Sequence, residues 1–295
     1  MKGRTLLCAS NSGLANRLPL LAGSLRVAEL TGRKLILYWP VNEAIGCEFS
    51  RLFTNPLTLF RAEDIDAVLD SCSTVKVYNS WHHPLLYTAV AEDGDPDTQI
   101  VIMKGWHAPR FRTEEDTPAF WEQMRPHLRA LEPAPALRAE VESFVLPERC
   151  IGVHLRRGEK HRSEFDASAD DHFEHIMDAL IMVEPSVTFF IATDDAMTEH
   201  KFLARYRDRA LIFPKTRPGR RDARGIEEAL IDLLLLSRTR AVLGNHYSSF
   251  SFFAGQWNGR PTVYATADSS GPQLELTTQQ LLTGSSDSMS PAVMA

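Results

Sequence analysis

Three polar segments, each placed directly after an apolar run, hold residue types that can bind and transfer a charged group. In the first of them, His154 precedes the run 156–162, in which four of the seven residues are Lys or Arg. Guanidinium groups hold phosphate oxygens in a bidentate geometry, so this run suits a diphosphate. The plain alternative is a solvated basic loop. A histidine-phosphatase motif is excluded, because Arg157 stands where that motif needs its nucleophilic histidine.

The second segment carries two adjacent carboxylates, Asp194 and Asp195, directly after Thr193. Such a pair can bind a metal, accept a hydrogen bond from a ribose, orient nearby arginines or cap the following helix. The residue types leave these roles open. A metal has the least support, since no further acidic cluster stands nearby in the sequence, and we expect no metal site.

The third segment, 244–251, combines a Gly-Asn turn with serines at the start of an apolar helix. Ser248 and Ser249 stand where backbone N–H groups and the positive end of a helix dipole bind anions. Simple capping of the helix by serine is compatible with that role.

Two further loops are polar. The first contains Gly13, Asn16 and Arg17 and could face a ligand, although it lacks both the dinucleotide-binding and the Walker A patterns. The second is the basic run 215–224, which also contains Pro and Gly. We expect this run to be solvated, with a lid over phosphates as the alternative.

Regular alternation of apolar strands and amphipathic helices positions these segments. In the C-terminal half the pattern predicts five strands separated by four helices, with the strands at 151–155, 187–192, 210–213, 241–243 and 262–264. The N-terminal half begins with a strand–helix–strand unit over about forty residues and continues with weaker patterns, namely strands at 75–78 and 100–104 and a helix at 119–131. This alternation predicts an α/β fold of Rossmann type, in which ligands bind at the carboxyl ends of parallel strands.

Length and composition indicate the number of domains. The 295 residues, 44 % of them hydrophobic and 24 % charged, are enough for about two domains at roughly 100–200 residues each. Prolines near 133 and 147 indicate a linker, so we predict two Rossmann-like domains with a cleft between them, at 1–135 and 148–284. The Ser-rich segment 285–295 is predicted to be a disordered tail.

Charge and cysteine usage restrict the class of protein. The net charge of −6 argues against a protein that coats nucleic acid. No apolar run approaches the roughly 18 residues of a membrane span, and the first residues read as a strand rather than a signal peptide. The four cysteines are scattered without a C-x-x-C pair, which indicates neither a zinc site nor a disulfide framework. We therefore expect a cytoplasmic protein.

The ordered segments resemble a known family. The runs 154–160, 190–195 and 232–249 are similar to three peptide motifs of GDP-fucose-dependent fucosyltransferases, and above all to those of the α1,6-fucosyltransferases, which include the rhizobial nodulation enzyme. The loop 12–17 resembles an N-terminal loop of the wider superfamily. The resemblance implies a GT-B fold of two Rossmann-like domains and an inverting, metal-independent transferase that uses a GDP-sugar, most simply GDP-fucose.

The resemblance also implies roles for single residues. Arg156 would hold the β-phosphate, His154 and Asp232 would contact guanine, and Ser248 and Ser249 would meet the diphosphate. Glu164 matches the family's proposed general base, and Lys160 matches a lysine between it and the motif histidine. The motif's usual aspartate is replaced by the longer Glu159. The expected donor site also includes Arg157, Asp194, Asp195, Gly13, Asn16 and Arg17.

The residue types agree with such a transfer. Arg156 and a helix N-terminus would stabilise the leaving diphosphate without a metal, and Glu164 would take the proton of the acceptor hydroxyl. Two alternatives remain: the same fold with another nucleotide sugar, and a non-catalytic module that binds GDP or a glycan. The expected partners are a GDP-sugar and a glycan or small-molecule hydroxyl acceptor, with peripheral membrane contact left open. No further cofactor and no nucleic acid are expected, in a bacterial cytoplasmic enzyme.

Overall fold

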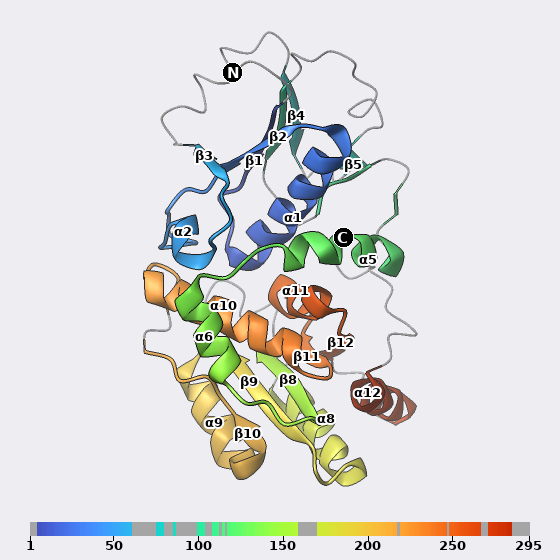
Figure 1. Ribbon diagram of the computed structural model, residues 1–295. Helices are drawn as coiled ribbons and strands as arrows, with labels where there is room; N and C mark the ends of the chain where they lie inside the picture. Colours follow the sequence, from blue (N-terminus) through green and yellow to red (C-terminus); the bar gives the residue numbers. More distant parts are fainter. Residues whose placement is uncertain are drawn as a thin grey trace. The chain divides into compact units, whose positions relative to one another are not determined.

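The computed structural model describes residues 5–60, 75–79, 85–86, 99–103, 108–111, 114–115, 117–158, 170–216, 219–246, 248–266 and 271–284. The chain forms two compact units: unit 1 comprises residues 1–134 and 220–226, and unit 2 comprises residues 135–219 and 227–295. Both units are α/β structures built on parallel sheets (Figure 1), as the alternating pattern predicts.

Unit 1 contains a five-stranded parallel sheet in the order β3-β2-β1-β6-β4. Its strands are β1 (Thr5–Ala9), β2 (Lys34–Tyr38), β3 (Thr58–Phe60), β4 (Val75–Asn79) and β6 (Gln99–Met103). The short strands β5 (Leu85–Leu86) and β7 (Arg110–Phe111) pair separately. The helices among its described residues are α1 (Leu14–Thr31), α2 (Phe49–Leu52) and α5 (Pro118–Arg129). The predicted strands at 75–78 and 100–104 and the predicted helix at 119–131 are confirmed, whereas β3 was not predicted.

The loop before α1 lies at the carboxyl edge of this sheet. All five residues of β1 are buried, and β1 pairs with β2 on one side and β6 on the other. Helix α1 follows after Gly13 and ends at Gly32, whose φ of 61° is the left-handed conformation that glycine adopts freely at a helix end. Residues 10–13 therefore lie where the strand order reverses, at the position where open α/β sheets bind ligands.

Unit 2 contains a second five-stranded parallel sheet, in the order β10-β9-β8-β11-β12. Its strands are β8 (Cys150–Leu155), β9 (Thr188–Thr193), β10 (Ala210–Leu211), β11 (Val242–Asn245) and β12 (Thr262–Ala265). Its helices are α6 (Pro135–Ser143), α8 (Asp170–Val183), α9 (Ala196–Tyr206), α10 (Ala223–Arg238), α11 (Ser249–Asn258) and α12 (Pro272–Thr283), with a 3₁₀ turn at Arg207–Arg209. The first four residues of α10 belong to unit 1.

Alternation along β8 directs its side chains to opposite faces of the sheet. Ile151, Val153 and Leu155 enter a core that they share with buried side chains of α8, α9 and α12. Gly152 and His154 face the other way, toward α10 and α11. Glycine is needed at 152, because a Cβ there would lie 2.8 Å from a methyl group of Leu236 and 2.7 Å from the hydroxyl of Thr239.

The strand order of unit 2 contains a switch point. The chain adds β9 and β10 on one side of β8 and then returns to add β11 and β12 on the other. The order therefore reverses between β8 and β11, and the segments that follow these two strands lie beside the switch point. The five predicted strands and four intervening helices are confirmed, although β10 is shorter than predicted and α12 was not predicted. Among the described helices, none is both long and apolar enough to cross a membrane.

Candidate functional site at the carboxyl edge of the unit 2 sheet

Arg156 and Asn245 join the ends of the two strands at the switch point. The backbone N–H of Arg156 donates to Oδ1 of Asn245 at 2.5 Å. This bond fixes the orientation of the buried Asn245 amide, whose Nδ2 has no acceptor among the described residues. A buried donor without a partner is costly, so this nitrogen suits a ligand oxygen such as that of a phosphate. The sequence predicts only a turn at the Gly-Asn pair, and Asn245 was not among the predicted ligand-binding residues.

Asp194 orients the arginine segment from the neighbouring strand. Its carboxylate forms an ion pair with the guanidinium of Arg156, and its Oδ1 accepts the backbone N–H of Arg157 at 2.7 Å. A Cβ at Gly158 would lie 2.7 Å from Nη2 of Arg156 and 2.9 Å from Oδ2 of Asp194, so a larger residue there would displace one side chain of the pair. Asp195 instead caps α9, since its Oδ2 accepts the backbone N–H of Thr198 at 2.7 Å. The two carboxylates therefore have different roles: Asp194 orients the arginine segment, and Asp195 caps a helix.

The Arg157 side chain bonds to helix α8. Its Nε and Nη2 lie 3.1 and 2.6 Å from Oδ1 of Asp170, and its guanidinium lies 5.7 Å from the ring centroid of Phe173. Through these contacts Arg157 holds the segment that follows β8 against α8. A contact between Arg157 and a donor molecule stays a prediction.

His154 is a buried, uncharged ring. Its Nδ1 lies 2.7 Å from Oγ of Ser251, and its ring stacks on Phe250 with centroids 4.7 Å apart. Burial, together with the positive charges of Arg156, Arg157 and Lys215, lowers the pKa of His154 to about 3. Gly244 permits the close approach of α11, because a Cβ there would lie 2.3 Å from that of Ser251.

The N-terminus of α11 faces the same edge. Ser248 is the N-cap residue and is buried, yet its side chain makes no capping hydrogen bond. The first N–H groups of a helix have no acceptor within the helix, so they remain suited to an anion. Ser249 is the first helical residue and is partly exposed. The Ser248 side chain therefore does not occupy these N–H groups, and the anion site at this helix start stays a prediction.

Asp232 lies on α10 and is buried, with its side chain 6 % exposed. Its Oδ2 is 3.1 Å from Nζ of Lys215, and its Oδ1 is buried without a hydrogen-bond donor among the described residues. Burial raises the pKa of Asp232 to about 7, against the opposing charge of Lys215. The expectation that the 215–224 run is solvated is wrong for Lys215, whose side chain is 10 % exposed.

In unit 1, the Arg17 side chain is buried and bonds to the loop segments around it. It is 1 % exposed, donates to the carbonyl oxygens of Ser12 and Pro40 at 2.7 and 2.9 Å, and lies over the ring of Trp39. Gly13 is the N-cap of α1, and Asn16 is partly buried with an unpartnered Oδ1. These three residues share one loop, and their contact with a donor stays a prediction.

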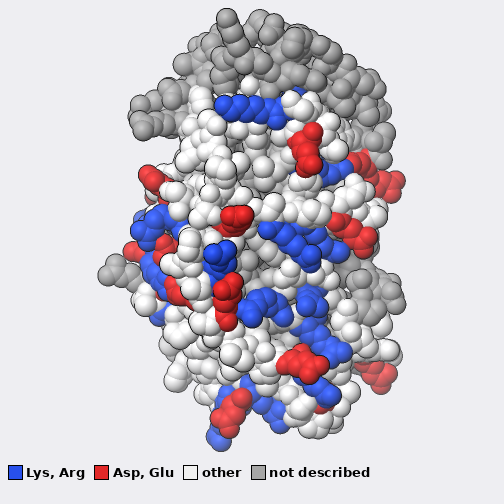
Figure 2. Space-filling view, in the orientation of Figure 1, with Lys and Arg blue, Asp and Glu red and all other residues white. Residues whose placement is uncertain are grey.

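Some predicted residues lie outside the described residues. They include Lys160 and Glu164 as well as Glu159 and the tail 285–295. Within the part of the chain that the structure describes, no group of three His, Cys, Asp or Glu side chains is arranged to hold a metal ion. On the face drawn in Figure 2, basic and acidic side chains are interspersed, so neither sign of charge dominates it.

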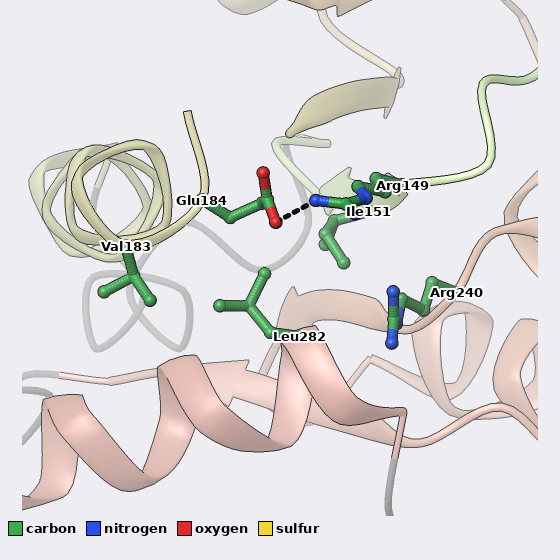
Figure 3. A pocket seen from close by; sticks show the side chains of 6 residues that line it. All are labelled: Arg149, Ile151, Val183, Glu184, Arg240 and Leu282. Atoms are coloured by element: carbon green, nitrogen blue, oxygen red, sulfur yellow. Dashed lines mark hydrogen bonds and ion pairs between the residues drawn. The ribbon is translucent and has the colours of Figure 1, made fainter. Parts of the chain in front are cut away.

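A separate pocket lies at the opposite edge of the unit 2 sheet (Figure 3). Arg149 precedes β8 and Arg240 precedes β11, so both lie at the amino ends of strands. Arg149 is paired with Glu184, and the remaining lining residues, Ile151, Val183 and Leu282, are apolar. This pocket lies away from the switch point and shares no residue with the candidate site.

Unit 2 is thus an α/β domain of Rossmann type, with an arginine ion pair, a buried amide nitrogen and a helix N-terminus at its switch point. The chain has the fold of known GDP-fucose-dependent fucosyltransferases. The NodZ alpha-1,6-fucosyltransferase of Bradyrhizobium, soaked with GDP-fucose, is 18 % identical over 88 % of this chain and 94 % of its own, with a TM-score of 0.57. The resemblance seen in the sequence motifs is confirmed at the level of the fold.

Two further structures have the same fold. A mutant of Arabidopsis thaliana FUT1 in complex with GDP is 15 % identical over 92 % of this chain and 73 % of its own, with a TM-score of 0.59. POFUT1 in complex with GDP is 11 % identical over 90 % and 98 %, with a TM-score of 0.55. No family model and no curated protein matches the sequence.

Proposed function

We propose that the protein is an inverting, metal-independent glycosyltransferase that moves a sugar, L-fucose, from a GDP-sugar to a hydroxyl acceptor. The observation that carries the proposal is the meeting of Arg156, Asn245 and the N-terminus of α11 at the switch point of the unit 2 sheet. This is where a doubly wound sheet binds a nucleotide. The solved structures with the same fold that contain GDP or GDP-fucose support the choice of donor.

In this proposal the donor diphosphate lies against the ends of β8 and β11. Arg156, oriented by Asp194, contacts the β-phosphate, and the Nδ2 of Asn245 donates to a phosphate oxygen. Ser248 and Ser249 contribute hydroxyl groups and the helix N-terminus. These donors stabilise the negative charge that develops on the leaving GDP as the anomeric C–O bond breaks.

The nucleobase would lie toward α10. Its guanine donors would reach the unpartnered Oδ1 of Asp232, and His154 would contact the base as an uncharged ring. A buried carboxylate oxygen requires a donor, and the N1–H and N2–H groups of guanine supply two on one edge. This pairing distinguishes guanine from adenine, which presents an acceptor nitrogen at the same place.

Transfer itself needs a base on the acceptor side. Glu164 takes the proton of the acceptor hydroxyl as the hydroxyl oxygen attacks the anomeric carbon on the face opposite GDP, and Lys160, four residues earlier in the sequence, is assigned to the same catalytic segment. The new C–O bond forms as the bond to GDP breaks, which inverts the anomeric configuration. Unit 1 is the acceptor-binding domain in this proposal, as expected from the sequence.

The first test measures nucleotide binding and turnover. Isothermal titration with GDP, ADP and UDP should give selective binding of GDP, and GDP-fucose should release GDP when an acceptor library is added. Arg156→Ala should weaken GDP binding by at least about tenfold, because a charge-assisted bond to phosphate is worth roughly 1.5–3 kcal/mol. The matched control is Arg149→Ala, which removes an arginine from the opposite edge of the same sheet.

The outcomes separate the alternatives. A folded Arg156→Ala variant with full GDP affinity and transfer would overturn the site. Selective GDP binding without turnover of any GDP-sugar would indicate a binding module. Glu164→Gln should keep GDP affinity and lose transfer, and a fully active Glu164→Gln variant would exclude that residue as the base.

A further inference from the structure

Lys215 lies buried between two carboxylates of unit 2. Its Nζ is 3.1 Å from Oδ2 of Asp232 on α10 and 3.3 Å from Oε2 of Glu199 on α9. Burial by itself would lower the pKa of Lys215, but Asp232 and Glu199 together raise it above its usual value. Lys215 is therefore a permanent cation at this position.

The segment that carries Lys215 is anchored to the same helix as Asp232. Both the backbone N–H and the hydroxyl of Thr216 donate to Oε1 of Glu228, at 2.8 and 2.7 Å. Glu228 and Asp232 are four residues apart on α10 and so lie on one face of that helix. The anchor at Glu228 places the Lys215 ammonium against the Asp232 carboxylate.

Lys215 engages only one of the two Asp232 oxygens. The other, Oδ1, is buried and has no donor among the described residues. Burial favours the protonated form of this carboxyl, and so do the negative charges of Glu199 and Glu228. The positive charge of Lys215 favours the ionised form. Lys215 is the cation that opposes protonation of Asp232.

We propose that Lys215 is a specificity-determining residue, which favours the ionised form of Asp232 and turns its carboxylate so that the free oxygen accepts the N–H groups of guanine. The proposal rests on the proposed function, since it concerns the base pocket of that donor site. A protonated carboxyl would present a donor in place of an acceptor and would pair poorly with two N–H groups. Lys215 acts through Asp232 and is a positioning residue, not a catalytic one.

The test is the pH dependence of GDP affinity, measured by isothermal titration between pH 6 and pH 9. In the wild type, GDP affinity should fall by about tenfold for each pH unit below the pKa of Asp232, since the protonated fraction rises tenfold per unit. Lys215→Met should move this midpoint to higher pH, weaken GDP binding at pH 7 by about tenfold or more, and reduce the preference for GDP over ADP. Lys215→Arg, which keeps the charge, should keep the wild-type midpoint.

Two further variants keep the proposal testable if Lys215→Met does not fold. Glu199→Gln removes a charge that favours the protonated form of Asp232, so it should move the midpoint to lower pH, opposite to Lys215→Met. Asp232→Asn should abolish the pH dependence. The matched control is Arg205→Met, which removes a cation lying between Asp178 and Glu174 and should leave the midpoint unchanged.

Each result decides one point. A wild type that does not prefer GDP to ADP would contradict the proposed function itself. A wild type that prefers GDP, together with a Lys215→Met midpoint equal to the wild-type value, would overturn the role of Lys215 alone. Tighter GDP binding by Lys215→Met would also overturn it, because Lys215 would then block the pocket. A Glu199→Gln midpoint that stays or rises would contradict the electrostatic argument.

Discussion

The backbone N–H of Arg156 and the side-chain oxygen of Asn245 are 2.5 Å apart, and this bond joins the ends of two parallel strands at the point where the strand order reverses. The bond uses the acceptor of the Asn245 amide and leaves its donor buried without a partner. The Asn245 oxygen thus fixes the orientation of the side chain, and its nitrogen remains available to a ligand. A fixed donor of this kind suits a preorganised anion site.

Asn245→Asp tests that donor. The substitution keeps an acceptor oxygen for Arg156 and replaces Nδ2 by a second carboxylate oxygen, which would repel a phosphate. We expect GDP affinity to fall by at least about tenfold, since one hydrogen bond to a charged group is worth roughly 1.5–3 kcal/mol. Isothermal titration measures the affinity and urea unfolding the stability.

Asn258→Asp is the contrast for that experiment. There the amide Nδ2 is already bonded to the carbonyl and hydroxyl oxygens of Ser237, at 3.1 and 3.0 Å. This variant should lose about 1–3 kcal/mol of stability while its folded form keeps wild-type GDP affinity. Equal affinities for the two variants would show that the Asn245 donor does not meet the ligand.

Gly158→Ala should disturb the ion pair between Arg156 and Asp194. The added Cβ would meet Nη2 of the arginine at 2.7 Å and Oδ2 of the aspartate at 2.9 Å, so one of them must move. GDP affinity should decrease by about tenfold, because the oriented guanidinium is displaced. Gly219→Ala is the control, since a Cβ there meets nothing within 4 Å. A Gly158→Ala variant that binds like the control would remove the pair from the site.

His154 should make the protein sensitive to acid. Burial lowers its pKa to about 3 in the folded state from 6.5 in an unfolded chain, so below pH 6.5 the unfolded state binds a proton that the folded state does not. The stability contributed by the neutral ring is complete above pH 6.5 and is lost as the pH falls toward 3. Between pH 7.5 and 5.0 this loss is about 2 kcal/mol.

His154→Gln isolates this contribution. The variant should lose about 2 kcal/mol less than the wild type over that pH interval, as measured by urea unfolding at each pH. His200→Gln changes an exposed histidine of the same unit and should keep the wild-type difference. If the two variants respond alike, the acid sensitivity arises elsewhere.

Arg17→Lys separates a structural role from a ligand-binding role. Lysine cannot reproduce the two bonds from the buried guanidinium to the carbonyl oxygens of Ser12 and Pro40. We expect a loss of about 2–3 kcal/mol in unfolding free energy, because two partly buried carbonyl groups lose their donors. The exposed Arg51→Lys in the same unit should change stability little. A stable Arg17→Lys variant with weakened GDP binding would favour direct contact with the donor.

The strands of unit 2 could be predicted because buried parallel strands appear in a sequence as short apolar runs bounded by turn residues. Helix α12 was missed because its buried face is only partly apolar: Thr277 and Thr278 are buried on it between the core residues Leu274 and Leu281. Likewise β3 is three residues long, too short for a periodic signal, and among the described strands it pairs only with β2.

The sequence by itself determined which residue types follow which strands, and therefore that Arg156, Asp194 and Ser248 belong to strand-end segments. Only the tertiary structure decided what each group meets. It assigned Asp194 to Arg156 and Asp195 to a helix cap, and it buried Lys215 against Asp232. The physical reason is that strand–loop–helix order is encoded locally, by periodicity and turn residues. Hydrogen-bond partners and desolvation, in contrast, depend on which distant segments the sheet order brings together.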